Sequence, residues 1–145
     1  MKPDILHITE ALRASWCPET STLGDDLPAD NPARGQCAVS SLVVQDFLGG
    51  DLFRVRVSGD GIDERHYYNV LDDSTVIDTT REQYQGKPVS LVPEPVDLEG
   101  KYASIREKSL DNEDTRRRYE VLRRLVGDIL GEHLLLSNFI GSVDE

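Results

Sequence analysis

The chain has 145 residues, with 27 acidic side chains against 16 Lys and Arg, and its formal net charge is −11 at pH 7. This length suits one domain over residues 1–145, and a hydrophobic content of 38% is enough for a packed core. The acidity argues against nucleic-acid binding, because phosphates attract positive surfaces. The apolar runs are too short to cross a membrane. We therefore predict a single domain that binds neither nucleic acid nor membrane.

The first ten residues contain no continuous apolar stretch of the kind found in signal peptides, so we expect a cytoplasmic protein. Cys17 and Cys37 are too few for a disulfide framework, and cytosolic thiols stay reduced. A zinc ion held by Cys37, His66 and Asp78, with Cys17 or water, is a rival use of these residues. No CxxC or HxxxH spacing supports that site. We predict neither a metal nor another cofactor.

The first half of the chain reads as two helices separated by a loop. Apolar residues recur at helical spacing over 4–16, and Pro18 closes that segment. Residues 19–35 are polar and carry Gly24, Pro28 and Pro32, which predicts a loop long enough to be functional. The almost wholly apolar run 37–48 predicts a buried helix that ends at Gly49-Gly50.

Three strand-like runs follow, joined by the Gly/Asp-rich segment 58–64 and by an Asp72-Asp73 turn. We expect them at 52–57, 66–71 and 75–79. Residues 85–112 contain three prolines, and we expect mostly irregular structure there, with one short strand at 89–92.

A further helix is expected from Thr115 to about Leu130, with Gly131 as its stop. The apolar tail after it is a candidate homodimer interface or docks on the core; its apolar residues are Leu134, Leu135, Leu136, Phe139 and Ile140. The predicted fold is α+β, with the cysteine-bearing helix packed on a small antiparallel sheet.

Cys37 is the first candidate for chemistry because it opens the buried helix. A helix N-terminus presents free N–H groups and about half a positive charge, which favour a thiolate and can bind an oxyanion. The alternative is a small hydrophobic core residue, since free cysteine is commonly buried.

His66 and Asp78 supply a base and an orienting carboxylate if they share one face of the sheet. A three-residue loop, 71–73, pairs His66 directly with Asp78, whereas a two-residue turn places Asp78 on the opposite face. A hydrogen bond between them, with the other ring nitrogen facing Cys37, therefore requires an odd loop or a bulge. The alternatives are a surface histidine at a strand end and an aspartate that caps a turn.

Four neighbouring residues are candidates for binding the oxyanion or the substrate. Gln36 can donate to an oxyanion or bond the preceding loop. Arg34 can bind a substrate carboxylate, although we favour pairing with one of the many acids. Trp16 lies beside the site or anchors the core. Asn31 belongs to the loop 19–35, which we expect along one side of the cleft.

Several motifs carry a family resemblance over roughly residues 12–84. They are Ser15-Trp16, the run from Asn31 to Gly50, His66-Tyr67-Tyr68-Asn69 and the run from Ile77 to Tyr84. Together they resemble the bacterial YunG-like family of uncharacterised proteins. The order of Cys37, His66 and Asp78 also resembles transglutaminase-like and papain-like cysteine enzymes.

This resemblance implies a transglutaminase-like or papain-like core in which Cys37 is the nucleophile, His66 the base and Asp78 the residue that orients it. It implies a cysteine hydrolase or acyltransferase acting on an amide, ester or isopeptide bond of a peptide or small molecule. The alternative is a non-catalytic module that binds a peptide or small ligand with the same fold. Rapid, pH-dependent alkylation of Cys37 relative to Cys17 separates the two.

Overall fold

The computed structural model describes residues 3–144, with side-chain surroundings through residue 131, and it is an α+β structure. The apolar side chains offered as a homodimer interface lie outside that part. Its elements in chain order are α1 (Ile5–Ser15), the 3₁₀ turn η1 (Gly24–Asp26), α2 (Cys37–Leu48), β1 (Asp51–Gly59), β2 (Ile62–Val70), β3 (Val76–Ile77), the 3₁₀ turn η2 (Arg81–Tyr84), β4 (Ser90–Pro93), α3 (Ile105–Asp111) and α4 (Glu113–Asp144).

The sheet is antiparallel throughout, with strand order β3-β2-β1-β4. Its centre is a long hairpin in which β1 and β2 pair from Asp51↔Val70 to Gly59↔Ile62. Asp60 and Gly61 alone form the turn, with φ of 51° and 80°. Such values are typical of the Asp-Gly hairpin turn, so the longer connection predicted over 58–64 is wrong.

The strand after the hairpin, β3, spans only Val76–Ile77 and is shorter than the predicted strand 75–79. It pairs with β2 through Asn69↔Ile77 and Val70↔Val76, so the loop between them has five residues, 71–75, rather than three. The direct pairing of His66 with Asp78 is therefore wrong. The loop is nevertheless odd in length, which keeps positions 66 and 78 on the same face.

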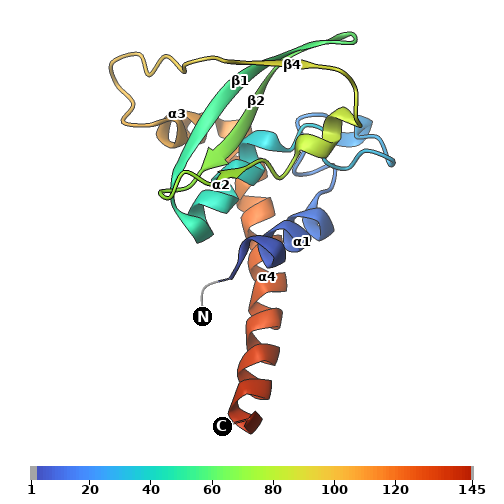
Figure 1. Ribbon diagram of the computed structural model, residues 1–145, viewed down its shortest axis with the longest axis vertical. Coiled ribbons are helices and arrows are strands. Elements are labelled where there is room, and N and C mark those ends of the chain that lie inside the picture. The colour runs from blue at the N-terminus through green and yellow to red at the C-terminus, as the bar shows by residue number, and fades with distance from the viewer. Residues whose placement is uncertain (1–2, 145) are drawn as a thin grey trace.

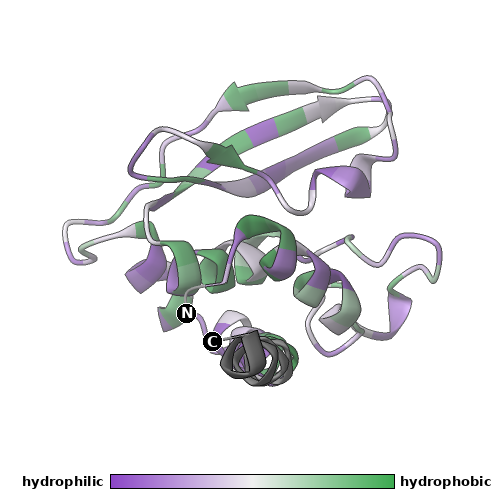
Figure 2. Cartoon of the chain, turned by 60° about the horizontal axis from the view of Figure 1, so that its bottom comes forward, coloured by the Kyte–Doolittle hydropathy of each residue, from purple (hydrophilic) through white to green (hydrophobic). Residues whose placement is uncertain are grey.

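Figure 2 shows three layers, with the sheet on one side, α1 and α2 in the middle and α4 on the other side. The main core joins α1, α2 and α4, and α2 lies between α4 and β2. Val39, Leu42 and Val43 of α2 are fully buried, in agreement with the apolar sequence of this helix. This burial fixes the position of the helix, and therefore of Cys37 at its start.

A smaller apolar cluster forms around Val55, Val57 and Tyr84, and Val89 and Leu91 pack against it. It holds β4 and η2 against β1. The region 85–112, predicted as mostly irregular, thus contributes an edge strand one residue later than expected. It also contains α3, whose N-cap Ser104 accepts a hydrogen bond from the Glu107 N–H at 3.1 Å. The position of β4 was hard to predict because three prolines lie in this region, and α3 was missed because it has only seven residues.

The last helix, α4, begins at Glu113 and continues through Gly131, so the predicted stop at Gly131 is wrong. A glycine inside a helix costs about 1 kcal/mol relative to alanine and ends the helix only when it adopts a positive φ, which Gly131 does not. Figure 1 shows α4 extending well beyond the remaining elements. Among the described residues, no helix is both long and apolar enough to cross a membrane.

Candidate active site

His66 and Asp78 form the central pair of the site. His66 lies on β2 and is fully buried, while Asp78 directly follows β3. The ring Nε2 lies 2.8 Å from one carboxylate oxygen of Asp78 and 2.9 Å from the other. The predicted hydrogen bond between the two side chains is therefore confirmed. Because Asp78 occupies Nε2, the other ring nitrogen, Nδ1, remains for other partners.

Cys37 opens α2, as predicted, and its thiol lies near enough to the His66 imidazole to contribute to the pKa of the ring. Burial lowers the pKa of His66, but the hydrogen bonds and negative charges of Asp78 and Cys37 outweigh it and raise this pKa to about 9. The imidazolium is therefore the favoured form of the ring at neutral pH. A positive ring beside the sulfur stabilises a thiolate.

The first turn of α2 has no side-chain cap. Its N-cap residue, Gln36, makes no side-chain hydrogen bond to the helix start. Cys37 and Ala38, which belong to this first turn, both line the cavity described below. Free N–H groups in this position can stabilise an oxyanion formed next to the sulfur.

Gln83 is a site residue that the sequence analysis missed. Its amide nitrogen lies 3.3 Å from Nδ1 of His66, while its amide oxygen accepts a hydrogen bond from Arg34 at 3.0 Å. Because Arg34 fixes the amide orientation, the nitrogen can donate to Nδ1 when the ring is neutral. Only its place within the Ile77–Tyr84 motif of the family resemblance pointed to it.

Arg34 pairs with an acid, as favoured from the sequence. Two of its nitrogens each lie 2.5 Å from a carboxylate oxygen of Glu64, and the Tyr84 hydroxyl donates to the same carboxylate at 3.1 Å. Burial alone would raise the pKa of Glu64, but the hydrogen bonds from Arg34 and Tyr84, with the Arg34 charge, lower it. Burial and the negative charge of Glu64 also raise the pKa of Tyr84. Glu64 is therefore an ionised partner that neutralises Arg34.

The loop 19–35 lies along the site, as predicted. Thr22, Leu23, Arg34 and Gly35 line the same cavity as Cys37. Asn31 does not line it, but its amide donates to the backbone oxygen of Gln83 at 2.9 Å. Asn31 therefore ties the loop to η2.

Gly35 ends the loop two residues before Cys37, and its surroundings leave no space for a side chain. It adopts a φ of 74°, and a side chain there would come within 2.5 Å of Ser21 Oγ. The Ser21 hydroxyl donates to the carbonyl of Arg34, and the Thr22 N–H donates to that of Gly35. The two ends of the loop are thus bonded together immediately before α2. Glycine is the residue that satisfies both the positive φ and the close approach.

Gln36 and Trp16 lie outside the cavity lining. Gln36 is fully buried, and its amide nitrogen donates to the carbonyl of Cys17 at 3.4 Å, which is the loop-bonding alternative stated above. Its amide oxygen has no hydrogen-bond partner among the described residues. Trp16 belongs to the main core, where its indole N–H donates to Ser40 at 2.9 Å. Neither residue is therefore in a position to contact a ligand in the cavity.

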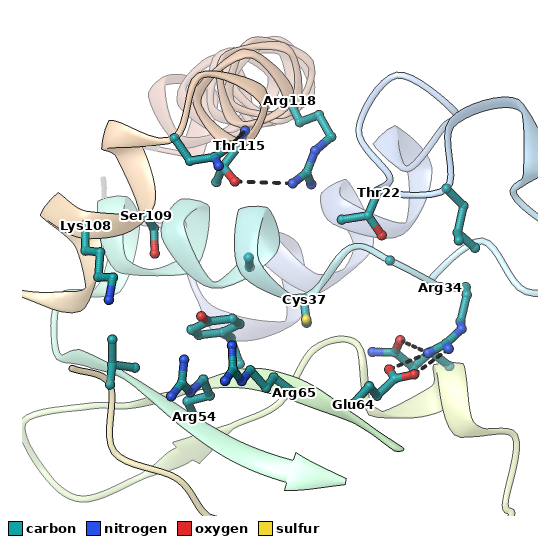
Figure 3. A pocket seen from close by; sticks show the side chains of 17 residues that line it. Thr22, Arg34, Cys37, Arg54, Glu64, Arg65, Lys108, Ser109, Thr115 and Arg118 are labelled. Atoms are coloured by element: carbon teal, nitrogen blue, oxygen red, sulfur yellow. Dashed lines mark hydrogen bonds and ion pairs between the residues drawn. The ribbon is translucent and has the colours of Figure 1, made fainter. Parts of the chain in front are cut away.

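The cavity in front of Cys37 has a volume of about 490 Å³ and is shown in Figure 3. It is bounded by the start of α2, by β1 and β2, by the loop 19–35 and by residues of α3 and α4. Within the described part of the chain, no group of three or more His, Cys, Asp or Glu side chains is arranged to hold a metal ion. The site therefore combines a cysteine, a carboxylate-bound histidine and a cavity large enough for a small ligand.

Comparison with known proteins places this α+β domain in a family. The model of the YunG protein family matches residues 4–131, and the chain belongs to the YunG family. A relative described as "Uncharacterized protein YunG", from Bacillus subtilis (strain 168), is 35% identical over 79 residues. That match covers 54% of this chain and 62% of the relative, so the chain spans less than two thirds of the relative's length. No solved structure matches the chain significantly.

Proposed function

We propose that this protein is a cysteine hydrolase or acyltransferase that acts on an amide, ester or isopeptide bond. The observation that carries the proposal is the placement of His66, whose Nε2 contacts both oxygens of Asp78 while the ring lies near the Cys37 thiol and is influenced by it. Carboxylate, imidazole and thiol therefore form one connected chain. Such a chain activates a thiol for nucleophilic attack.

In the first half of the proposed reaction, the Cys37 sulfur attacks the carbonyl carbon of the substrate. The carbonyl oxygen gains negative charge, and the N–H groups at the start of α2 stabilise it. As the tetrahedral intermediate collapses, the bond to the leaving nitrogen or oxygen breaks. The His66 imidazolium gives its Nδ1 proton to that leaving group, and a thioester on Cys37 remains.

In the second half, His66 is neutral, and its Nδ1 accepts a proton from the incoming nucleophile. Water in this role releases a carboxylic acid, whereas an amine gives a new amide. In both cases the bond between carbonyl carbon and sulfur breaks, and the thiolate and imidazolium are restored. Asp78 holds Nε2 throughout, so the ring keeps one orientation. Gln83 can donate to Nδ1 during the neutral stage.

The element order around the site supports the proposal further. The cysteine begins a buried helix, the histidine lies on the central hairpin, and the aspartate follows the next strand. The transglutaminase-like and papain-like enzymes share this order, and we propose that the core is of that kind. The chemistry itself is inferred from the side chains and their contacts, because a fold alone does not define a reaction.

The direct test is to trap the acyl intermediate. We expect 4-nitrophenyl acetate to release nitrophenolate in a burst and to add one acetyl group to Cys37, located by mass spectrometry of the digested protein. Cys37→Ser should abolish the burst and keep the fold, because the change is small and serine is tolerated at a helix start. Cys17→Ser is the matched control and should acylate like the wild type.

The outcome that contradicts the proposal is equally specific. If acetyl groups appear on Cys17 and Cys37 at equal, slow rates, Cys37 is not an activated nucleophile. The protein is then better described as a module that binds a ligand in the same cavity.

A further inference from the structure

Positively charged side chains are concentrated around the cavity beside Cys37, although the net charge of the whole chain is −11. Cationic side chains reach it from the loop before α2, from both central strands and from α3 and α4. They are Arg34, Arg54, Arg65, Lys108 and Arg118. Among the described residues that line the cavity, Glu64 supplies the one carboxylate. Glu64 binds Arg34, so four cations face the cavity without a carboxylate in its lining.

The acids that balance these four cations lie outside the lining. Glu94 is shared by Arg54 at 3.6 Å and Arg65 at 3.3 Å, and it also lies 3.9 Å from Arg56. Arg56 has a closer partner in Asp63, at 2.9 Å, so Glu94 is the carboxylate shared by Arg54 and Arg65. Arg118 pairs with Asp114 at 2.9 Å. Lys108 lies 3.7 Å from Glu99, and its ammonium also donates to the carbonyl of Asp97. This arrangement leaves the cavity side of the cluster positive, with its acids behind it.

Three of the cations lie together. In Figure 3, Arg54, Arg65 and Lys108 lie on one side of Cys37, and the Arg34–Glu64 pair lies on the other side. Arg54 is held in place, because it donates to the backbone oxygens of Glu94 and Pro95 and its side chain is 10% exposed. The side chains of Arg65 and Lys108 are 56% and 34% exposed, so both can move onto a ligand. We call these three residues the cationic cluster.

We propose that the substrate is an acyl compound with a negatively charged group, which the cationic cluster binds while Cys37 attacks the carbonyl carbon. This inference rests on the proposed function and names the substrate class for the same site. The two guanidinium groups can each give paired hydrogen bonds to an oxyanion such as a carboxylate, and the ammonium adds a third charge. An overall charge of −11 would repel an anion from most of the surface, so the cluster defines where it binds.

Two alkylating reagents of similar size test this inference without a known substrate. Iodoacetate carries a negative charge, and iodoacetamide is its neutral counterpart. The rate ratio of iodoacetate to iodoacetamide should be higher at Cys37 than at free cysteine by about tenfold in low salt. The ratio at Cys17 in the same molecule should be equal to or below that of free cysteine, because the protein is acidic.

His66 is also positive in the proposed resting state, so the wild-type ratio alone does not identify the cluster. Arg65→Gln and Lys108→Gln, made singly and together, separate the two contributions. Each should lower the ratio at Cys37 by a few-fold, and the double variant should lower it by about tenfold. Arg56→Gln is the matched control, because it also removes one positive charge. Arg56 lies on β1 near Glu94 but does not line the cavity.

The outcomes distinguish this inference from the proposed function. If Cys37 reacts fast but its ratio is the same in the wild type and the double variant, the substrate class is wrong and the activated cysteine stands. If Cys37 reacts slowly with both reagents and independently of His66, the proposed function fails and the substrate class fails with it. A ratio that falls in the double variant but not in Arg56→Gln supports both.

Discussion

The two cysteines have similar exposure but different surroundings. Both are half-buried and free of disulfides. Cys37 begins α2, lines the cavity and lies near the buried His66. Cys17 follows the end of α1 in a turn, where its backbone N–H and carbonyl are both bonded to the Thr20 hydroxyl, at 3.1 and 3.0 Å. Its carbonyl also accepts the hydrogen bond from Gln36.

This difference shows that neither residue type nor exposure defines the candidate nucleophile. What distinguishes Cys37 is its position at an uncapped helix start, beside a histidine that a carboxylate holds in place. Cys17 contributes to the structure through its backbone. Each of the following predictions changes one of these neighbours and asks whether the two cysteines become more alike.

The largest effect concerns His66 and pH. The folded protein raises the pKa of His66 from 6.5 to about 9. Folding therefore favours the protonated ring, and this stabilisation is complete below about pH 6.5 and is lost as the pH rises through about 9. We expect wild type to lose about 3 kcal/mol of this contribution between pH 6 and pH 9.5. Urea denaturation of wild type and His66→Gln at both pH values measures the difference.

His66→Gln lacks this titration, so the stability gap between the two proteins should narrow at the higher pH. A gap that stays constant across this range would show that folding does not favour the imidazolium. The distinction between the two cysteines would then lose its electrostatic basis.

A smaller effect is expected for Asp78→Asn, which keeps the shape of the side chain and removes its charge. The pKa of His66 should fall, because the carboxylate that stabilises the imidazolium is gone. If the pKa falls by one unit, the protonated fraction of the ring at pH 9 falls about fivefold, and alkylation of Cys37 at that pH should slow by a similar factor. An NMR titration of His66 and mass-resolved alkylation rates measure these two changes. Unchanged values for both would remove Asp78 from the site.

Gln83→Ala should have a more modest effect. It removes the amide that contacts both Arg34 and Nδ1 of His66, and we expect the protein to lose about 1 kcal/mol of stability. Thermal or urea denaturation measures this loss. Glu82→Ala is the control, since Glu82 is a neighbour in η2 whose ion pair with Arg13 is exposed and contributes little. Equal losses in both variants would show that Gln83 has no special place in the site.

The smallest effect is expected for Cys17→Ser, whose hydrogen bonds are made by the backbone and survive the substitution. The alkylation rate of Cys37 should stay within about twofold of wild type, since the two thiols are not part of one network. Rates measured on the single-cysteine protein check this. A large change would mean that the two cysteines are coupled through Gln36.

The features that the sequence predicted well depend on local patterns. The helix 37–48 has the predicted bounds because its apolar run ends at two glycines with positive φ. The hydrogen bond between His66 and Asp78 was predicted from the even spacing of their positions and from the family resemblance. The strand register that allows this bond was not predicted correctly. A loop of three residues and a loop of five residues both place positions 66 and 78 on the same face of the sheet, so the face alone does not distinguish the two registers.

The features that the sequence did not predict depend on contacts between distant segments. Gln83 is in the site because η2 packs near Arg34, whose guanidinium donates to the Gln83 side chain. A contact between residues so far apart in the chain cannot be predicted from a local sequence pattern. The cationic cluster assembles from β1, β2 and α3, and α3 itself was missed. Trp16 was ambiguous for the same reason, since its partner Ser40 lies on a different helix.

The pH dependence of alkylation at both cysteines tests the central claim most directly. Iodoacetamide is applied from pH 5 to 9, and the modification of each cysteine is followed by mass spectrometry in wild type and His66→Gln. We predict that Cys37 of the wild type reacts rapidly already at pH 6 and that His66→Gln slows it there by about a hundredfold. Cys17 should react slowly at pH 6 and at the same rate in both proteins. Parallel, slow profiles for the two cysteines, unaltered by His66→Gln, would contradict the account.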